Sequence, residues 1–168
     1  MNEPVNPTTS RQRVLIESLD LEFGSLHERS CLIIKQTPAD ILYQRPSETS
    51  PLSVGENVLR SAAAVEQTFG GLMSNLWDDP FEWTLPETLS TCERVLEYLE
   101  EVASTRKRAF SGFSSDAELS KNIVLPSDKI QPLISVLVET LVRASHYQGR
   151  AVASLKFLSD VRVRGVII

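Results

Sequence analysis

Apolar residues recur every three or four positions over four long stretches of the chain, with charged and polar residues between them. This spacing places the apolar side chains on one face of an α-helix. The predicted helices cover residues 11–34, 53–77, 85–110 and 132–158. Each has its own apolar stripe, which must be buried against a neighbour. The pattern therefore predicts an all-α protein, a four-helix bundle.

Three of the expected helix starts carry residues that satisfy the free backbone N–H groups of a first helical turn. Ser53 and Glu56 are spaced as a capping box, in which the serine oxygen accepts from the first turn and the glutamate accepts from the capping residue. Thr84 and Glu87 repeat this spacing before the third stretch, and Ser10 precedes the first. We expect helices to begin at these residues.

The stretch 133–158 is the longest uninterrupted helical pattern, and we expect it to form the central helix.

The length of 168 residues predicts a single domain, 1–168. Residues 1–9 are polar and are expected to be flexible. Residues 161–168 alternate apolar and basic side chains and then become wholly apolar, which predicts a short extended tail covered by the bundle or by a partner.

Two connections between the helices are distinctive. Residues 111–131 contain glycine, serine and proline and predict a long connection with one helical turn near Asp116. The segment from Trp77 to Trp83 combines both tryptophans with three carboxylates. We interpret it as a loop whose aromatic rings close one end of the bundle and whose carboxylates favour the start of the third helix. A metal or sugar site is the alternative.

Charge and composition restrict the possible partners. The chain has 17 basic and 22 acidic residues, a net charge of -5, and its basic residues are scattered, which argues against nucleic acid or a membrane as a partner. No stretch is apolar enough for a membrane span or a leader, so the expected location is cytoplasmic. Cys31 and Cys92 match no zinc or redox spacing and are expected to be buried free thiols.

Two short motifs resemble those of the DinB/YfiT-like superfamily of four-helix bundles. Residues 53–60, Ser-Val-Gly-Glu-Asn-Val-Leu-Arg, look like the family's motif on the second helix, and 146–150, His-Tyr-Gln-Gly-Arg, look like the motif on the last. The resemblance covers nearly the whole chain. It implies parallel second and third helices and a divalent metal held by three histidines. The family's characterised members resemble thiol-dependent transferases or isomerases.

The chain departs from the family at the metal. The three ligand positions of the resemblance fall on Arg60, Arg143 and Tyr147, and none of these side chains is a plausible zinc or nickel ligand. Positions 143 and 147 still share a helical face, whereas His146 lies to one side of it and His27 is on another helix. We therefore expect no metal and no cofactor at these positions. A site rebuilt from His27 and His146 would need a different geometry.

Chain reach gives a different topology from the resemblance. If Asp78 to Thr84 were the whole connection between the second and third helices, it would span at most about 27 Å. The second helix would be about 36 Å long, so reach alone favours an antiparallel pair. The parallel topology of the family is nevertheless the one expected, because frayed ends and offset helices shorten the gap.

Three functions follow from these residues. The first is a metal-free bundle with a cleft for a small anionic molecule, formed by Arg60, Arg143, Tyr147 and His146. The second is a metal-dependent thiol transferase, isomerase or hydrolase, and the third is a structural protein that acts through dimerisation. A homodimer is expected, and no catalytic residue is assigned. Either a carboxylate such as Glu22 or Glu66 neutralises the two arginines, or an anionic ligand does.

Overall fold

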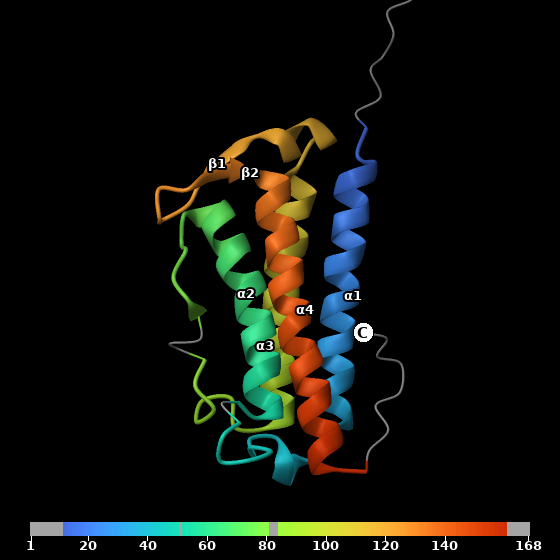
Figure 1. Cartoon of the computed structure of the whole chain (residues 1–168). Coiled ribbons are helices and arrows are strands. Elements are labelled where there is room, and N and C mark those ends of the chain that lie inside the picture. The colour runs from blue at the N-terminus through green and yellow to red at the C-terminus, as the bar shows by residue number, and fades with distance from the viewer. Residues whose placement is uncertain (1–11, 51, 81–83, 161–168) are drawn as a thin grey trace, which may run out of the picture.

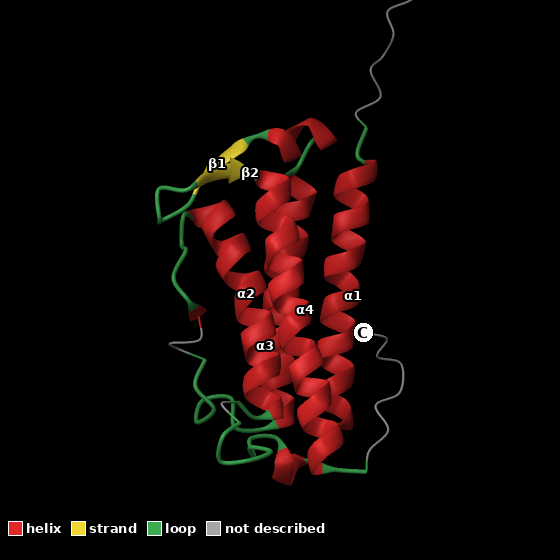
Figure 2. Cartoon of the chain, in the orientation of Figure 1, coloured by secondary structure: helices red, strands yellow, loops and turns green. Residues whose placement is uncertain are grey.

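The computed structural model of the chain describes residues 12–50, 52–80 and 84–160. Four long helices make up most of this part of the chain and form a bundle (Figures 1 and 2), which confirms the expected all-α fold. The expected flexible N-terminus, 1–9, and the expected tail, 161–168, lie outside the described residues. The helices are α1 (Val14–Gln36), α2 (Val54–Ser74), α3 (Cys92–Gly112) and α4 (Leu133–Leu158).

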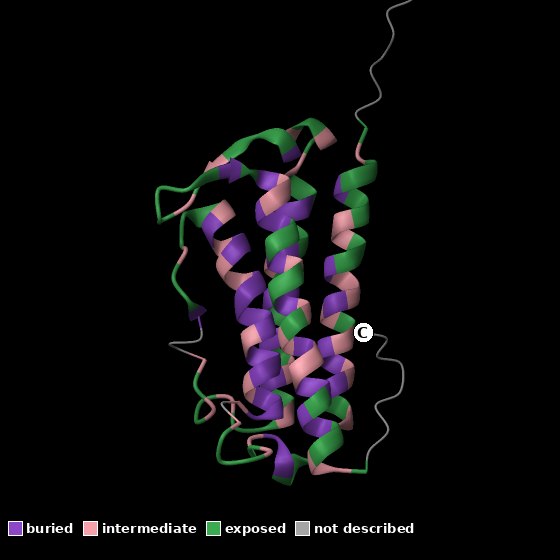
Figure 3. Cartoon of the chain, in the orientation of Figure 1, coloured by how far each residue is buried: buried purple, intermediate pink, exposed green. Residues whose placement is uncertain are grey.

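The four helices form a square in which α2 packs against α3 and α4, and α1 packs against the same two helices. Buried residues recur along all four helices (Figure 3), and their apolar side chains form one core cluster. Its centre contains three fully buried aromatic rings from three helices, with centroids 5.2 to 5.7 Å apart: Phe23, Phe69 and Phe110. The expectation that 133–158 is a central helix is wrong, because α4 occupies one corner and packs mainly on α2 and α1.

Helices α2 and α3 run in the same direction (Figure 1). The contact between Phe69 and Phe110, each near the C-terminal end of its helix, agrees with this parallel arrangement. The reach estimate pointed the other way because it took the connection to be Asp78–Thr84. The connection in fact runs from residue 75 to residue 91 and returns along the side of the bundle. The topology is therefore the parallel one that the resemblance implied.

Of the two predicted capping boxes, the one at Ser53 is present and the one at Thr84 is not. Ser53 forms the expected capping box: its Oγ accepts from the Glu56 N–H at 3.2 Å, and its own N–H donates to Glu56 Oε2 at 2.7 Å. The expected start at Thr84 is wrong. Helix α3 begins at Cys92 and is capped by Thr91, whose Oγ1 accepts from Arg94 N–H. The Thr84 hydroxyl donates instead to a carbonyl four residues earlier.

Helix α2 ends at Ser74, earlier than expected, because the next residue leaves the helical conformation. Asn75 has φ 56°, in the left-handed region, and its N–H donates to the Gly71 carbonyl. Asparagine tolerates this region better than most residues, so it terminates helices readily. The residues that follow, including Trp77, are thereby free to fold back over α2.

Helix α1 begins at Val14, not at residue 11, and its start is capped from a distant segment. Both carboxylate oxygens of Asp116 accept backbone N–H groups of the first turn, from Leu15 at 3.1 Å and Ile16 at 3.0 Å. Asp116 opens the short helix η3 (Asp116–Ser120), which confirms the predicted turn. The N-cap residue itself, Arg13, makes no side-chain cap, and no local sequence pattern indicates this partner 100 residues away.

The connection between α3 and α4 also contains a β-hairpin that the sequence pattern did not predict. Strands β1 (Asn122–Val124) and β2 (Ile130–Pro132) pair antiparallel, with Ile123 opposite Gln131. A short helix, η1 (Ala39–Ile41), lies at the opposite end of the bundle. Among the described helices, none is both long enough and apolar enough to cross a lipid bilayer.

Candidate functional site

The face between α2 and α4 contains a small cavity of about 70 Å³. Arg60 from α2 and Arg143 and Tyr147 from α4 all line it, together with Gln67 and Asp79. These two helices are antiparallel neighbours, so residue 60 lies opposite residue 147 and residue 64 lies opposite residue 143. Three of the four residues predicted from the sequence are therefore brought together.

Arg60 is neutralised by a carboxylate that was not expected to face it. Its Nη1 lies 3.3 Å from Asp79 Oδ2, on the connection that follows α2. Neither suggested carboxylate occupies this place: Glu66 accepts a hydrogen bond from Tyr98 on α3, and Glu22 is exposed on α1. The expected internal partner is thus Asp79, and the expectation of Glu22 or Glu66 is wrong.

Arg143 donates hydrogen bonds to neutral groups of α2. Its Nη2 donates to Gln67 Oε1 at 3.1 Å and to the Ala64 carbonyl at 3.4 Å. Its positive charge is thus directed towards the cavity by neutral acceptors and remains exposed. Because a guanidinium has five N–H donors in a fixed plane, further donors remain for an oxygen-bearing ligand.

His146 is not brought into the cleft. It is exposed on α4, and its ring meets the Tyr147 ring edge-on at 5.8 Å. His146 does not line either of the two cavities described on this face. Unlike the other three predicted residues, His146 therefore does not line the cleft. Its position one residue from Tyr147 turns it about 100° around the helix, away from α2.

A larger cavity, of about 390 Å³, adjoins the small one and shares Gln67 and Arg143 with it. Its apolar wall comes from three different elements: the loop after α2, the hairpin turn and the first half of α4. These apolar residues are Trp77, Leu125, Pro126 and Val136. This cavity could not be predicted from the sequence, because its wall depends on the unpredicted hairpin. A cavity with an apolar wall and a few polar and charged side chains, here including Arg143 and Glu139, is typical of a small-molecule site.

Trp77 is held in place as a wall of the large cavity. Its carbonyl accepts from Gln67 Nε2 at 2.8 Å, and its indole N–H donates to Asn75 Oδ1 at 3.1 Å. The ring lies directly over Gly71, where a Cβ would come within 2.2 Å of it. For Trp77, the expectation that this segment closes one end of the bundle is wrong, since the ring lies on the side of α2. Trp83 lies outside the described residues.

One carboxylate lies at the outer edge of the large cavity. Glu139 accepts from Gln131 Nε2 at 3.2 Å and pairs with Lys129 Nζ at 3.5 Å. The Gln131 amide and then the Lys129 ammonium lower the pKa of this carboxyl. Glu139 is therefore ionised at neutral pH. It pairs with Lys129, and the nearby guanidinium of Arg143, which lines both cavities, also lowers its pKa.

The chemistry of the three converging side chains differs from that of a metal centre. Two guanidiniums and a phenol are donors of hydrogen bonds, and a guanidinium cannot lose its proton to bind a cation. The free thiols lie elsewhere, Cys31 buried on α1 and Cys92 half-buried on α3. This arrangement suits the oxygens of an anion.

Comparison of the chain with protein-family models, with curated proteins and with solved structures finds no match. Membership of the DinB/YfiT-like superfamily therefore stays a prediction from the two short motifs.

Proposed function

We propose that the protein binds a small monoanionic carboxylate with an apolar body in the cleft between α2 and α4. The observation that carries this proposal is the position of Arg143, which lines both cavities at once. A carboxylate beside it can accept two parallel hydrogen bonds from the guanidinium. Tyr147 supplies a further donor from the next turn of the same helix.

Charge within the small cavity favours one negative charge over two. Asp79 already neutralises Arg60, which leaves Arg143 as the second cation of this cavity. A monoanion therefore completes the charge balance, whereas a phosphate dianion would be repelled by Asp79. The apolar wall of Trp77, Leu125 and Val136 next to this head group favours an aromatic or branched body.

We also propose that the chain is a divergent DinB/YfiT-like bundle. Two observations support this relationship: α2 and α3 run parallel, and the three positions that correspond to the family's metal ligands converge on one cavity. With arginine and tyrosine at these positions, the site would bind an anion at the place in the fold where the family binds a metal cation. The thiol chemistry of the family would then have no metal to activate the thiol here.

Thermal-shift measurements with a panel of carboxylates test the proposed ligand. Benzoate, phenylacetate and branched-chain carboxylates should raise the melting temperature of the wild type with saturation, while inorganic phosphate and the matching neutral amides should not. Arg143→Ala should abolish the shift. Arg108→Ala removes an exposed guanidinium from α3, away from both cavities, and should leave the shift unchanged.

A failure of all carboxylates to stabilise the wild type would contradict the proposal. An equal shift in the wild type and in Arg143→Ala would place the ligand elsewhere. Because Arg143 is exposed and its hydrogen bonds go to the neutral groups of Gln67 and Ala64, its removal should cost little stability by itself. The ligand effect is therefore separable from an effect on folding.

A further inference from the structure

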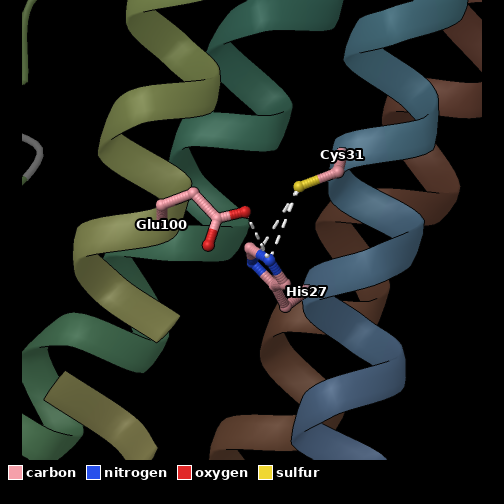
Figure 4. Close-up of side chains that lie close together, drawn as sticks. All are labelled: His27, Cys31 and Glu100. Carbon is pink, nitrogen blue, oxygen red and sulfur yellow. Dashed lines mark hydrogen bonds and ion pairs between the residues drawn. The ribbon is translucent and has the colours of Figure 1, made fainter. Parts of the chain in front are cut away.

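A second group of side chains lies on the opposite pair of helices, between α1 and α3. His27 and Cys31 are one turn apart on α1, and Glu100 faces them from α3 (Figure 4). His27 Nε2 is 3.2 Å from Glu100 Oε1 and 3.7 Å from Cys31 Sγ. One ligand atom from each residue lies within 4.8 Å of the other two. From the sequence, Cys31 was expected only to be a buried free thiol.

These separations match the edges of a tetrahedral zinc site. Zinc binds sulfur at about 2.3 Å and imidazole nitrogen or carboxylate oxygen at about 2.0 Å. Tetrahedral angles then place nitrogen and sulfur about 3.5 Å apart, and nitrogen and oxygen about 3.3 Å apart. The observed 3.7 and 3.2 Å are close to both values.

The same geometry argues against a Cys–His–Glu catalytic triad. In such a triad the nucleophile and the carboxylate face opposite nitrogens of the imidazole ring. Here Nε2 faces the carboxylate and is also the ring nitrogen nearer to the sulfur, while Nδ1 is 4.0 Å from the sulfur. One nitrogen that converges with a sulfur and an oxygen is the arrangement of ligands around a single ion.

We propose that His27, Cys31 and Glu100 bind a divalent cation of the zinc class. The thiolate and imidazole select zinc over magnesium or calcium, which prefer oxygen ligands. Cys31 is buried and the His27 side chain is 19% exposed, so two ligands are fixed within the packed bundle. The Glu100 side chain is 68% exposed, so the third ligand lies at the surface and leaves a fourth position to water.

The charged surroundings change the pKa of the thiol in this group. Burial, and then the carboxylate of Glu100, raise the pKa of the Cys31 thiol. Glu28 raises it further, and Lys35 on the same helix opposes this effect. The thiol is therefore protonated without metal, and a bound cation must displace its proton. The site is independent of the cleft between α2 and α4, and neither proposal requires the other.

Metal titration of the whole chain tests this site. Protein stripped with a chelator should bind one Zn²⁺ per chain in competition with a chromophoric chelator, and Co²⁺ should produce a thiolate-to-metal charge-transfer band. Cys31→Ser and His27→Gln should each lower the zinc affinity by more than about 100-fold. Mutation of a residue that only hydrogen-bonds to a metal ligand costs up to about that much, and loss of a ligand itself should cost more. Glu100→Gln should lower it less, because this ligand lies at the surface, where water can take its place.

Two matched variants serve as controls. Cys92→Ser removes the other described thiol, and His146→Gln removes the other histidine, and both should retain zinc binding and the Co²⁺ band. Absence of zinc binding by the wild type, or a Co²⁺ complex without the thiolate band, would overturn the proposal without reference to any variant. Zinc binding that survives Cys31→Ser would overturn it as well. Circular dichroism of the metal-free variants checks that each is folded.

Discussion

The hydroxyl oxygens of Thr68 on α2 and Thr140 on α4 lie 2.7 Å apart in the buried contact between the two helices. Each is also close to the carbonyl one turn earlier, Ala64 O at 3.1 Å and Val136 O at 2.8 Å. Each hydroxyl has a single hydrogen, so one threonine donates to its carbonyl while the other donates across the helix contact. The pair thus joins α2 and α4 at the edge of the large cavity.

Loss of this hydrogen bond should be measurable as a coupling between the two positions. Thr68→Val and Thr140→Val should each lower the free energy of unfolding by about 1 kcal/mol. The double variant should lose less than the sum, because no buried hydroxyl is left without its partner. Urea unfolding of the four proteins measures the coupling, and strict additivity would show that the two hydroxyls do not interact.

The buried guanidinium of Arg106 should depend on the charge of Asp20. Arg106 is 4% exposed, and its Nη1 donates to both the carboxylate and the carbonyl of Asp20 on α1. Asp20→Asn keeps the shape but removes the counter-ion. Because the Asp20 side chain is 41% exposed, water screens part of the charge. The expected loss is about 1–2 kcal/mol, less than the about 3–5 kcal/mol of a fully buried pair.

Glu17→Gln is the matched control for Asp20→Asn, because it neutralises an exposed carboxylate on the same helix, 4.0 Å from Arg13. It should change the free energy of unfolding by no more than about 0.5 kcal/mol. Equal losses in the two variants, measured by chemical denaturation, would show that the burial of Arg106 does not strengthen its ion pair.

Glu118 should make stability depend on pH in the acidic range. The Ser114 hydroxyl, at 2.6 Å, and the Ser114 N–H hold the pKa of this carboxyl at about 2, below its ordinary value of 4.5. The unfolded chain therefore takes up the proton first as the pH falls. The stabilisation is complete above pH 4.5 and is lost as the pH falls towards 2.

Ser114→Ala removes the hydroxyl and should raise the pKa of Glu118, which NMR titration of its side chain can follow. Glu118→Gln should remove this part of the pH dependence of unfolding altogether. A wild-type Glu118 that titrates at its ordinary value would contradict the expectation.

The expected homodimer and the expected role of the tail 161–168 stay predictions from the sequence. Sedimentation equilibrium over a range of concentrations tests the dimer, and a monomer at every concentration would contradict it.

Truncation after Asp160 should lower the melting temperature or change the oligomer, because it removes the apolar end of Val166, Ile167 and Ile168.

Periodicity identified the elements that depend on local sequence. Each helix buries one stripe of its own residues, and Ser53 with Glu56 forms a cap from neighbouring positions. The spacing of Arg143 and Tyr147 likewise placed them on one face, and the resemblance supplied the helix that carries Arg60 opposite them. These features could be predicted because their determinants lie within a few residues, or within one recognisable motif.

Other features depend on contacts between distant segments, which a single sequence does not display. Asp116 caps a helix 100 residues away, and Asp79 reaches Arg60 only because its loop folds back along α2. Thr84 and Glu87 have the spacing of a capping box, yet the helix begins later, where Thr91 provides the cap. Glu100 meets His27 and Cys31 through the packing of α3 on α1, so sequence spacing could not reveal that group.

Gly71 should control the shape of the proposed ligand site through Trp77. A Cβ at position 71 would lie 2.2 to 2.4 Å from atoms of the indole ring, so Gly71→Ala must displace the ring from the cavity wall. Carboxylate binding should weaken several-fold, and the tryptophan emission should shift as the ring moves. Gly24→Ala is the control, because its Cβ would meet only Arg106 Nη1 at 3.8 Å.

Both substitutions replace a glycine inside a helix by alanine, which by itself favours the helix by up to about 1 kcal/mol. Gly24→Ala should therefore raise the melting temperature and leave emission and carboxylate binding unchanged. In Gly71→Ala the same gain is opposed by the displaced indole, so emission and affinity are the decisive measurements and the melting temperature is not. Unchanged emission in Gly71→Ala would mean that Trp77 does not lie over α2. A shifted emission with unchanged affinity would show that Trp77 packs on Gly71 in the wild type but does not take part in ligand binding.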